Sequence, residues 1–418
     1  MRRLSAYQVY LIICGASALF FATITTVTGV YLVTVAHFTP FELLLVGTVL
    51  EATCFLMELP TGIVADVYSR RLSVIIGLAL IGLGFMLEGS MPRLAPVLIA
   101  QVIWGIGATF VSGAQEAWIA DELGQEGVGI GRVYLRGAQA DQLGALLGIG
   151  LSVALASLHI GLAIVVGGAL HVALALALLA IMPERHFQRA EHGSHNPFHA
   201  MRATAAGGLR AVRGRPVLIT ILAIGAFFGA SSEAFDRLWE AHFLTDIGLP
   251  SLGGLPFVVW FGIITAGEML LSIGATEIAR RRVDSDSHAG AARALLAINT
   301  LMIAGMLAFG LSQGFVAALA AYWAVRLLRR TRMPLYTAWV NQGINPRVRA
   351  TVLSLASQAD ALGQVGGGPL LGLIGSAVSI PAALISAGLF LAPANFLFTR
   401  TLRHQEPVGA VSEAEGGG

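Results

Sequence analysis

Charged side chains stand inside two long apolar stretches of this sequence, and their spacing could support ion or substrate binding. The residues of this kind are Glu233, Asp236, Arg237, Arg326, Arg329 and Arg330. A charge at the centre of a bilayer costs at least a few kcal/mol, so each one needs a partner, water or a function. On a helix the three later arginines would share one face, which would attract an anion or keep carboxylates ionised. Glu233 and Arg237 are four residues apart and could instead satisfy each other.

Further carboxyl groups also fall inside apolar stretches, namely Asp141, Asp360, Glu58, Glu116 and Glu268. Asp141 and Asp360 lie roughly ten residues into their predicted helices, which is a depth of about 15 Å. Two carboxyls that touch in a low dielectric cannot both ionise, so one of them would bind a proton. The alternative is that Asp141 is a structural group, held by the backbone or by Arg136.

The sequence lacks the motifs of several enzyme and motor classes. No lysine occurs, so the Gly-x-x-x-x-Gly-Lys phosphate loop of ATP-driven motors cannot form. Neither His-Glu-x-x-His nor Gly-x-Ser-x-Gly occurs. Cys14 and Cys54 lie in apolar runs, which argues against a disulfide or a zinc site. We therefore expect no enzyme, no catalytic residue, no metal site and no cofactor.

Membrane-spanning helices are the elements that must position these side chains. Of the 418 residues, 56% are hydrophobic and only 12% are charged, whereas a soluble protein carries about a quarter charged residues. One span takes roughly 20 apolar residues, and the pattern predicts twelve helices. The expected spans cover about residues 8–34, 40–64, 72–90, 94–120, 131–157, 160–182, 216–245, 255–279, 292–312, 315–340, 350–376 and 379–401.

The positions of the arginines indicate which side of the membrane each loop faces. Apart from Arg93, every arginine outside the predicted spans falls on one side. Basic loops stay in the cytoplasm, so we expect a multi-pass protein of the bacterial inner membrane with both termini cytoplasmic. The expected domains are a six-helix bundle at 1–182, a cytoplasmic basic linker at 183–215, a second bundle at 216–403 and a disordered tail at 404–418.

The two halves contain a repeat. The segment Gln139-Ala-Asp-Gln-Leu-Gly144 of the fifth span recurs as Gln358-Ala-Asp-Ala-Leu-Gly363 in the eleventh. Trp104 and Trp323 are as far apart in the sequence as these two segments are. This pattern predicts two parallel six-helix repeats, with a site near the midplane between them.

A loop motif connects the chain to a known family. Between the second and third spans stands Gly62-Ile-Val-Ala-Asp66-Val-Tyr-Ser-Arg70-Arg71. It resembles the cytoplasmic signature of the major facilitator superfamily, and a degraded copy begins at Gly274. We expect Gly62 to allow close helix approach, Asp66 to lie at a helix N-terminus and Arg70 to bridge an acid of the fourth span. The predicted conformational gate therefore comprises Gly62, Asp66, Arg70, Arg71 and Asp121, with Glu122 as the alternative acid.

The resemblance implies where the intramembrane charges lie. In this family the first, fourth, seventh and tenth helices line a central cavity, so the three arginines would face it with Glu116 as a candidate partner. The fifth helix packs on the eighth and the eleventh on the second. That would bring Asp141 near Glu268, and Asp360 near Glu58, as proton-binding pairs.

Two segments, Glu58–Gly62 and Gly113–Glu122, resemble bacterial drug-efflux members, including macrolide and tetracycline exporters. Two features depart from those exporters. Gln101 stands where many of them carry an arginine, and their Gly-Pro-rich motif of the fifth helix has its counterpart in the eleventh, at Gly363–Gly372.

We expect a monomeric secondary transporter that exports an amphipathic compound, with protons as the coupling ion and no nucleic-acid partner. The alternatives are a transporter of an anionic metabolite and, from another class, a transport-fold receptor or lipid flippase.

Overall fold

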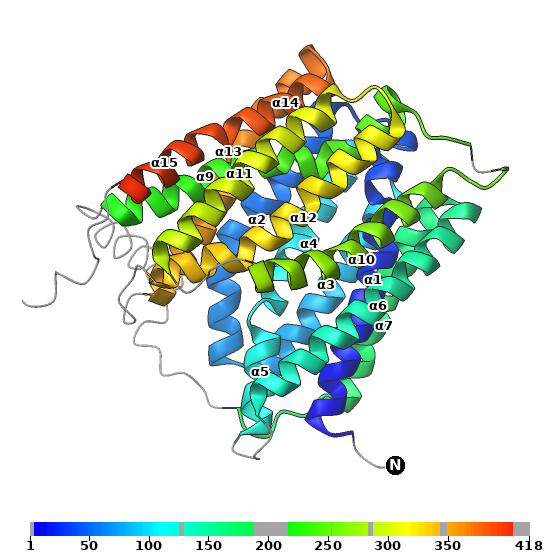
Figure 1. Cartoon of the computed structure of the whole chain (residues 1–418). Helices are drawn as coiled ribbons and strands as arrows, with labels where there is room; N and C mark the ends of the chain where they lie inside the picture. The colour runs from blue at the N-terminus through cyan, green and yellow to red at the C-terminus, as the bar shows by residue number, and fades with distance from the viewer. Residues whose placement is uncertain are drawn as a thin grey trace, which may run out of the picture. The chain divides into compact units, whose positions relative to one another are not determined.

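The computed structural model describes residues 4–124, 129–187, 216–251, 253–282, 287–342 and 349–403. Within these ranges every regular element is a helix (Figure 1). Ten helical spans of the described chain are long and apolar enough to cross a membrane. Two more long helices, α12 and α13, have 28 and 29 residues and carry polar side chains along their length. The predicted all-α membrane fold is therefore confirmed.

The described chain forms two compact units. The first unit holds Leu249–Gly267 and the helices up to α7, and the second unit holds the rest. The helices of the first unit are α1 (Ala6–Thr34), α2 (Pro40–Val67), α3 (Arg70–Ser90), α4 (Leu94–Val111), α5 (Ala114–Leu123), α6 (Ile130–Leu158) and α7 (Ile160–Ile181). The elements of the second are α9 (Pro216–His242), the π-helical turn η1 (Phe243–Ile247), α11 (His288–Leu311), α12 (Phe315–Gln342), α13 (Arg349–Ala377), α14 (Ile380–Phe390) and α15 (Ala392–Arg403). Helix α10 (Val258–Arg282) begins in the first unit and ends in the second.

Local sequence explains where the helices begin and end. Ser5 and Gln8 form a capping box that starts α1, and Ser69 caps α3. The fourth predicted span is interrupted, because α4 ends before Ser112 and α5 starts after Gly113. Gly113 has φ +72°, a left-handed conformation that glycine adopts without strain.

Glycines set the packing inside the first unit, where α6 lies along α1 (Figure 1). A Cβ added at Gly144 would lie 2.1 Å from the Gly15 carbonyl oxygen. One added at Gly148 would lie 2.2 Å from the Leu19 oxygen. The two backbones are therefore closer than any side chain at these positions would allow.

The second unit repeats this packing between α13 and α9. A Cβ added at Gly363 would lie 2.1 Å from the Ala226 carbonyl oxygen, and one added at Gly367 would lie 2.5 Å from the Ala230 Cα. Gly363 and Gly367 are the repeat counterparts of the two α6 glycines. The repeat seen in the sequence thus corresponds to the same helix–helix contact in each unit.

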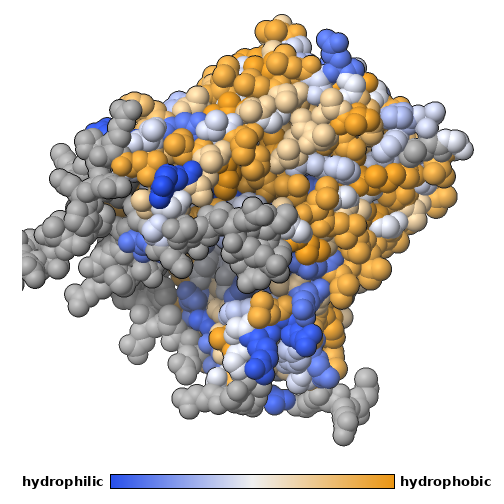
Figure 2. All heavy atoms as spheres, in the orientation of Figure 1, coloured by the Kyte–Doolittle hydropathy of each residue, from blue (hydrophilic) through white to orange (hydrophobic). Residues whose placement is uncertain are grey.

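Large apolar side chains cover the outer faces of α6 and α7 (Figure 2). Leu143 and Leu147 of α6 are each 65% exposed, and Leu176 of α7 is 61% exposed. Such surfaces are stable against lipid tails and would be costly in water. The predicted domain boundaries stay predictions, since most of residues 183–215 lie outside the described ranges, as does the tail after Arg403.

Candidate functional site

The second unit contains a cluster of ion pairs between three membrane-spanning helices. We call it the arginine–carboxylate cluster, and it consists of Asp236, Glu268, Arg326, Arg329 and Arg330. Arg326 donates from Nε to Glu268 Oε2 at 2.9 Å and from Nη1 to Asp236 Oδ1 at 3.0 Å. Arg329 donates from both terminal nitrogens to the two oxygens of Asp236, each at 2.7 Å. Arg330 donates to Glu268 Oε1 at 3.3 Å.

Helical spacing explains why α12 supplies all three arginines. Residues 326, 329 and 330 are three and four positions apart and so point to the same side of the helix. The carboxylates come from α9 and α10, which present Asp236 and Glu268 to that side. The predicted arginine face of the tenth span is thus present and is occupied by acids of the same unit.

The charges in the cluster do not cancel. Its three guanidinium groups face two carboxylates, and the Glu268 side chain is only 4% exposed. Arg330 makes the longest of the contacts, and its side chain is 55% exposed. The cluster therefore combines a buried acid with a guanidinium group that is accessible to a ligand.

Arg332, three residues after Arg329 on α12, is buried and forms no ion pair with an acid in the described part of the chain. Its guanidinium carbon lies 3.7 Å from the centre of the Phe228 ring and 4.9 Å from that of Tyr336. Its Nε has no hydrogen-bond partner among the described residues. Aromatic faces can stabilise a cation in this way without any acid. The pairing of Glu116 with an α12 arginine joins the two units and stays a prediction.

Helix α9 carries two more buried acids on the side of Asp236. Glu233 accepts a hydrogen bond from Arg237 Nε at 3.0 Å, so the local pair predicted from their spacing is present. Glu240 is only 6% exposed, and its Oε2 has no hydrogen-bond partner within the described part of the chain. Glu240 is therefore a buried acid beside the site that the sequence-based set of site residues does not include. The sequence feature that could have identified Glu240 is its spacing: it follows Asp236 by four residues and Glu233 by seven, so the three acids share one face of α9.

Two other predicted proton carriers, Asp360 and Asp141, form no ion pair within the described part of their own units. Asp360 accepts a hydrogen bond from Gln364 Nε2 at 2.9 Å. Asp141 is exposed on α6, and Arg136 donates to Gln139 at 3.0 Å instead of to this carboxylate. Glu268 belongs to the cluster described above, so its carboxylate is already ion-paired. The predicted pairs of Asp141 with Glu268 and of Asp360 with Glu58 join the two units and stay predictions.

The predicted gate residues lie together at the start of α3. Arg70 donates from Nη1 to Asp121 and to the Ala117 carbonyl oxygen, and its Nη2 lies 3.6 Å from Asp66 Oδ1. Of the two candidate acids at the end of the fourth span, Asp121 and not Glu122 is the one that Arg70 contacts. Arg71 donates from Nη2 to the Leu179 oxygen at 2.6 Å. Whether these contacts act as a gate stays a prediction.

Two details of the gate differ from expectation. Within the first unit no described atom lies within 4 Å of a Cβ added at Gly62, so the expected close approach there is absent. The first half of α2 makes that approach, since a Cβ added at Gly105 of α4 would lie 3.0 Å from Thr53. Glu122 binds elsewhere, because its Oε1 accepts the backbone N–H groups of Arg185 and His186 at 2.5 and 3.0 Å.

Known proteins resemble this chain over most of its length. The sequence model of the Major Facilitator Superfamily matches residues 10–341. The uncharacterized MFS-type transporter YxaM of Bacillus subtilis (strain 168) is 22% identical over 360 residues, which are 85% of this chain and 86% of that protein.

Solved structures show the same fold at low sequence identity. The nucleoside transporter NupG is 13% identical, with a TM-score of 0.77 over 96% of this chain and 100% of that one. A bacterial homolog of the human lysosomal transporter Spinster, in an inward-facing and unoccupied conformation, is 14% identical, with a TM-score of 0.72 over 95% and 96% of the two chains. A POT peptide transporter in complex with sulfate is 12% identical, with a TM-score of 0.73 over 95% and 94%. Together with the helical membrane fold, the family match across most of the sequence shows that this chain belongs to the major facilitator superfamily and is a multi-pass membrane transporter of that type.

Proposed function

We propose that this protein is a secondary active transporter that moves a small molecule across the bacterial inner membrane by alternating access, coupled to protons. The observation that carries the proposal is the arginine–carboxylate cluster inside membrane-spanning helices. Buried ion pairs lose much of their stabilisation when one acid takes up a proton. Proton binding and the arrangement of α9, α10 and α12 would therefore depend on each other.

For the cargo we propose export of an amphipathic compound. An aromatic group in the first unit supports this choice. The Phe85 and Trp104 rings lie 4.8 Å apart, and Phe21, which is 39% exposed, lies 6.0 and 6.1 Å from them. Thr25 is exposed one turn further along α1. Ring faces next to a hydroxyl suit a molecule with apolar and polar parts.

An anionic metabolite is the second candidate, favoured by the surplus guanidinium group of the cluster and the exposure of Arg330. Guanidinium groups bind carboxylates and phosphates bidentately. The two candidates differ in charge, so a ligand screen can separate them. Compounds that raise the unfolding temperature of the purified protein identify the class, because a ligand stabilises only the state that it binds.

Counterflow in proteoliposomes tests the proposal. Vesicles loaded with an unlabelled hit should accumulate the labelled hit, because both exchange through one site. The control is the same vesicle with Arg326→Ala protein. A hit that binds but shows no counterflow would contradict transport and favour the receptor; lipid scrambling in the same vesicles would favour the flippase.

A further inference from the structure

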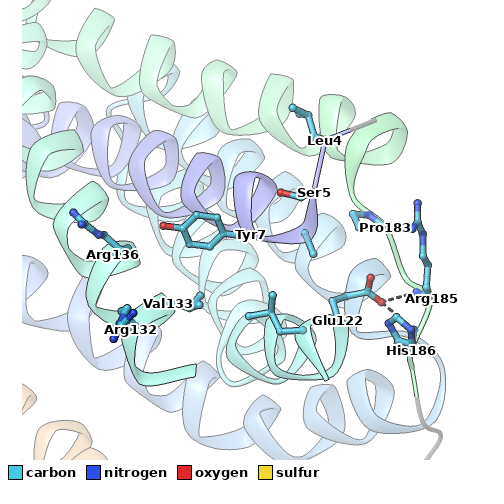
Figure 3. A pocket seen from close by; sticks show the side chains of 12 residues that line it. Leu4, Ser5, Tyr7, Glu122, Arg132, Val133, Arg136, Pro183, Arg185 and His186 are labelled. Atoms are coloured by element: carbon cyan, nitrogen blue, oxygen red, sulfur yellow. Dashed lines mark hydrogen bonds between the residues drawn. The ribbon is translucent and has the colours of Figure 1, made fainter. Parts of the chain in front are cut away.

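A cavity of about 520 Å³ opens in the first unit, and no residue of the arginine–carboxylate cluster belongs to its lining (Figure 3). Its walls are the start of α1, the end of α5, the start of α6 and the segment that follows α7. The first three are ends of membrane-spanning helices, and the fourth directly follows such a helix. The cavity therefore lies near one surface of the membrane, on the side that the basic loops predict to be cytoplasmic.

The lining combines an apolar floor with a basic rim. Val133 and Leu123 are 1% and 8% exposed and form part of the floor. Three arginines belong to the lining: Figure 3 shows Arg132 and Arg136 on one side and Arg185 on the opposite side. This arrangement would hold a molecule that has an apolar part and a negatively charged group.

The one acid of the lining does not neutralise this rim. Glu122 is 7% exposed and uses Oε1 to accept the backbone N–H groups of Arg185 and His186 (Figure 3). The guanidinium groups of Arg132 and Arg185 form no ion pair with any acid in the described part of the chain. Arg136 donates to the uncharged Gln139 side chain at 3.0 Å. The rim thus keeps three guanidinium groups whose charge is not balanced by a side-chain contact to an acid.

We propose that this cavity binds an organic phosphate, with the phosphate oxygens on the arginine side chains and the carbon part on the apolar floor. Guanidinium groups donate in a planar fork that fits two phosphate oxygens at once. Tyr7, another residue of the lining, carries a hydroxyl group that could be a further donor. Two sources supply such a group at this surface: the headgroup of an anionic phospholipid and a soluble phosphate ester of the cytoplasm. The proposal does not depend on the proposed transport function.

Binding by the purified full chain in nanodiscs separates the sources. One arm varies the fraction of phosphatidylglycerol in phosphatidylcholine nanodiscs, and the other adds phenyl phosphate to pure phosphatidylcholine nanodiscs. The readouts are the unfolding temperature and, for the lipid arm, the number of phosphatidylglycerol molecules retained in native mass spectrometry. A response in the first arm assigns the lipid, and a response in the second assigns a soluble ester.

The test variant is Arg132→Gln/Arg185→Gln, and the matched control is Arg293→Gln/Arg400→Gln. The control removes two exposed arginines from the predicted cytoplasmic side that do not line the cavity. We expect the test variant to lose at least about fivefold in apparent affinity and the control to keep it. Arg132→Lys/Arg185→Lys, which keeps the charge and loses the fork, should fall between them.

Three results would overturn the proposal. They are no response in either arm, an equal loss in the control pair, and full binding by the Gln pair. The unfolding temperature without ligand shows in each case whether a variant is folded, so a loss through misfolding is recognised.

Discussion

Arg326 joins two acids from two different helices, which gives it the central place among the intramembrane charges. Its removal would not affect the two acids equally. Asp236 would keep the bidentate contact with Arg329, whereas Glu268 would keep only the 3.3 Å contact with Arg330. Within the second unit, the acid that loses its counter-ion is therefore Glu268 and not Asp236.

We predict that Arg326→Ala abolishes transport and lowers the free energy of unfolding by about 3 kcal/mol, because a buried acid is left poorly paired. Replacing Glu268 with Gln in the same protein should recover much of the stability without recovering transport. Chemical or thermal unfolding in detergent, alongside counterflow, measures both effects. Arg293→Ala, outside the cluster, is the control; normal transport by Arg326→Ala would show that the cluster is not part of the pathway.

Among the buried acids outside the arginine–carboxylate cluster, Glu240 is best placed to take up a proton, since one of its carboxylate oxygens has no partner in the described chain. A neutral side chain of the same shape should be tolerated there. We predict that Glu240→Gln leaves the unfolding temperature unchanged or higher and flattens the dependence of transport on pH. The matched variant Glu42→Gln, in the half-buried first turn of α2, should keep the wild-type pH profile, since Gln can also serve in the capping box that Glu42 forms with Thr39. A wild-type profile in Glu240→Gln would assign the proton to another group.

Spacing along one helix was readable from the sequence, and partners across helices were not. The α12 arginines and the pair of Glu233 with Arg237 follow from three- and four-residue separations. The contact of Glu268 with Arg326 joins residues 58 positions apart. Only the tertiary placement of α10 beside the arginines of α12 decides that contact, so no local pattern indicated it.

At the scale of elements, glycines decide how closely helices pack. We predict that Gly144→Leu and Gly363→Leu each lower the free energy of unfolding by about 1–3 kcal/mol, because the new side chain would meet a backbone carbonyl oxygen of the neighbouring helix. Gly150→Leu on α6 and Gly366→Leu on α13 are matched controls, since a Cβ there meets no described atom within 4 Å. Thermal unfolding followed by size-exclusion chromatography compares the four variants. Equal losses in the controls would mean that helix propensity, not packing, causes the effect.

The contact between α3 and α5 can be tested by charge exchange. We predict that Arg70→Ala slows the exchange between conformations, and transport with it, by roughly tenfold while the protein stays folded, which corresponds to about 1.4 kcal/mol. The exchanged variant Arg70→Asp/Asp121→Arg should recover part of the rate, since it restores the pair in reverse. Distances between spin labels on the two units report the conformations. A loss of substrate affinity with normal exchange would contradict the gate.

At the scale of the whole molecule, composition and periodicity were sufficient for the fold. Apolar runs of about 20 residues and a repeated helix-packing segment predicted two similar helical units. The interruption at Ser112–Gly113 and the π-helical turn after α9 were not predicted, because the average hydropathy of a span does not reveal a local break in helix geometry. The sequence also does not predict the substrate, since proteins that share this fold carry different molecules.

Proton movement coupled to cargo tests the central claim most directly. Proteoliposomes that contain a pH-sensitive dye and no imposed gradient should show a change in internal pH when the hit from the ligand screen is added outside. The Arg326→Ala protein should show none, although it inserts equally well. We predict a pH change that grows with cargo concentration and saturates at the same concentration as the counterflow signal. Cargo movement at the wild-type rate without any pH change would contradict proton coupling through this cluster.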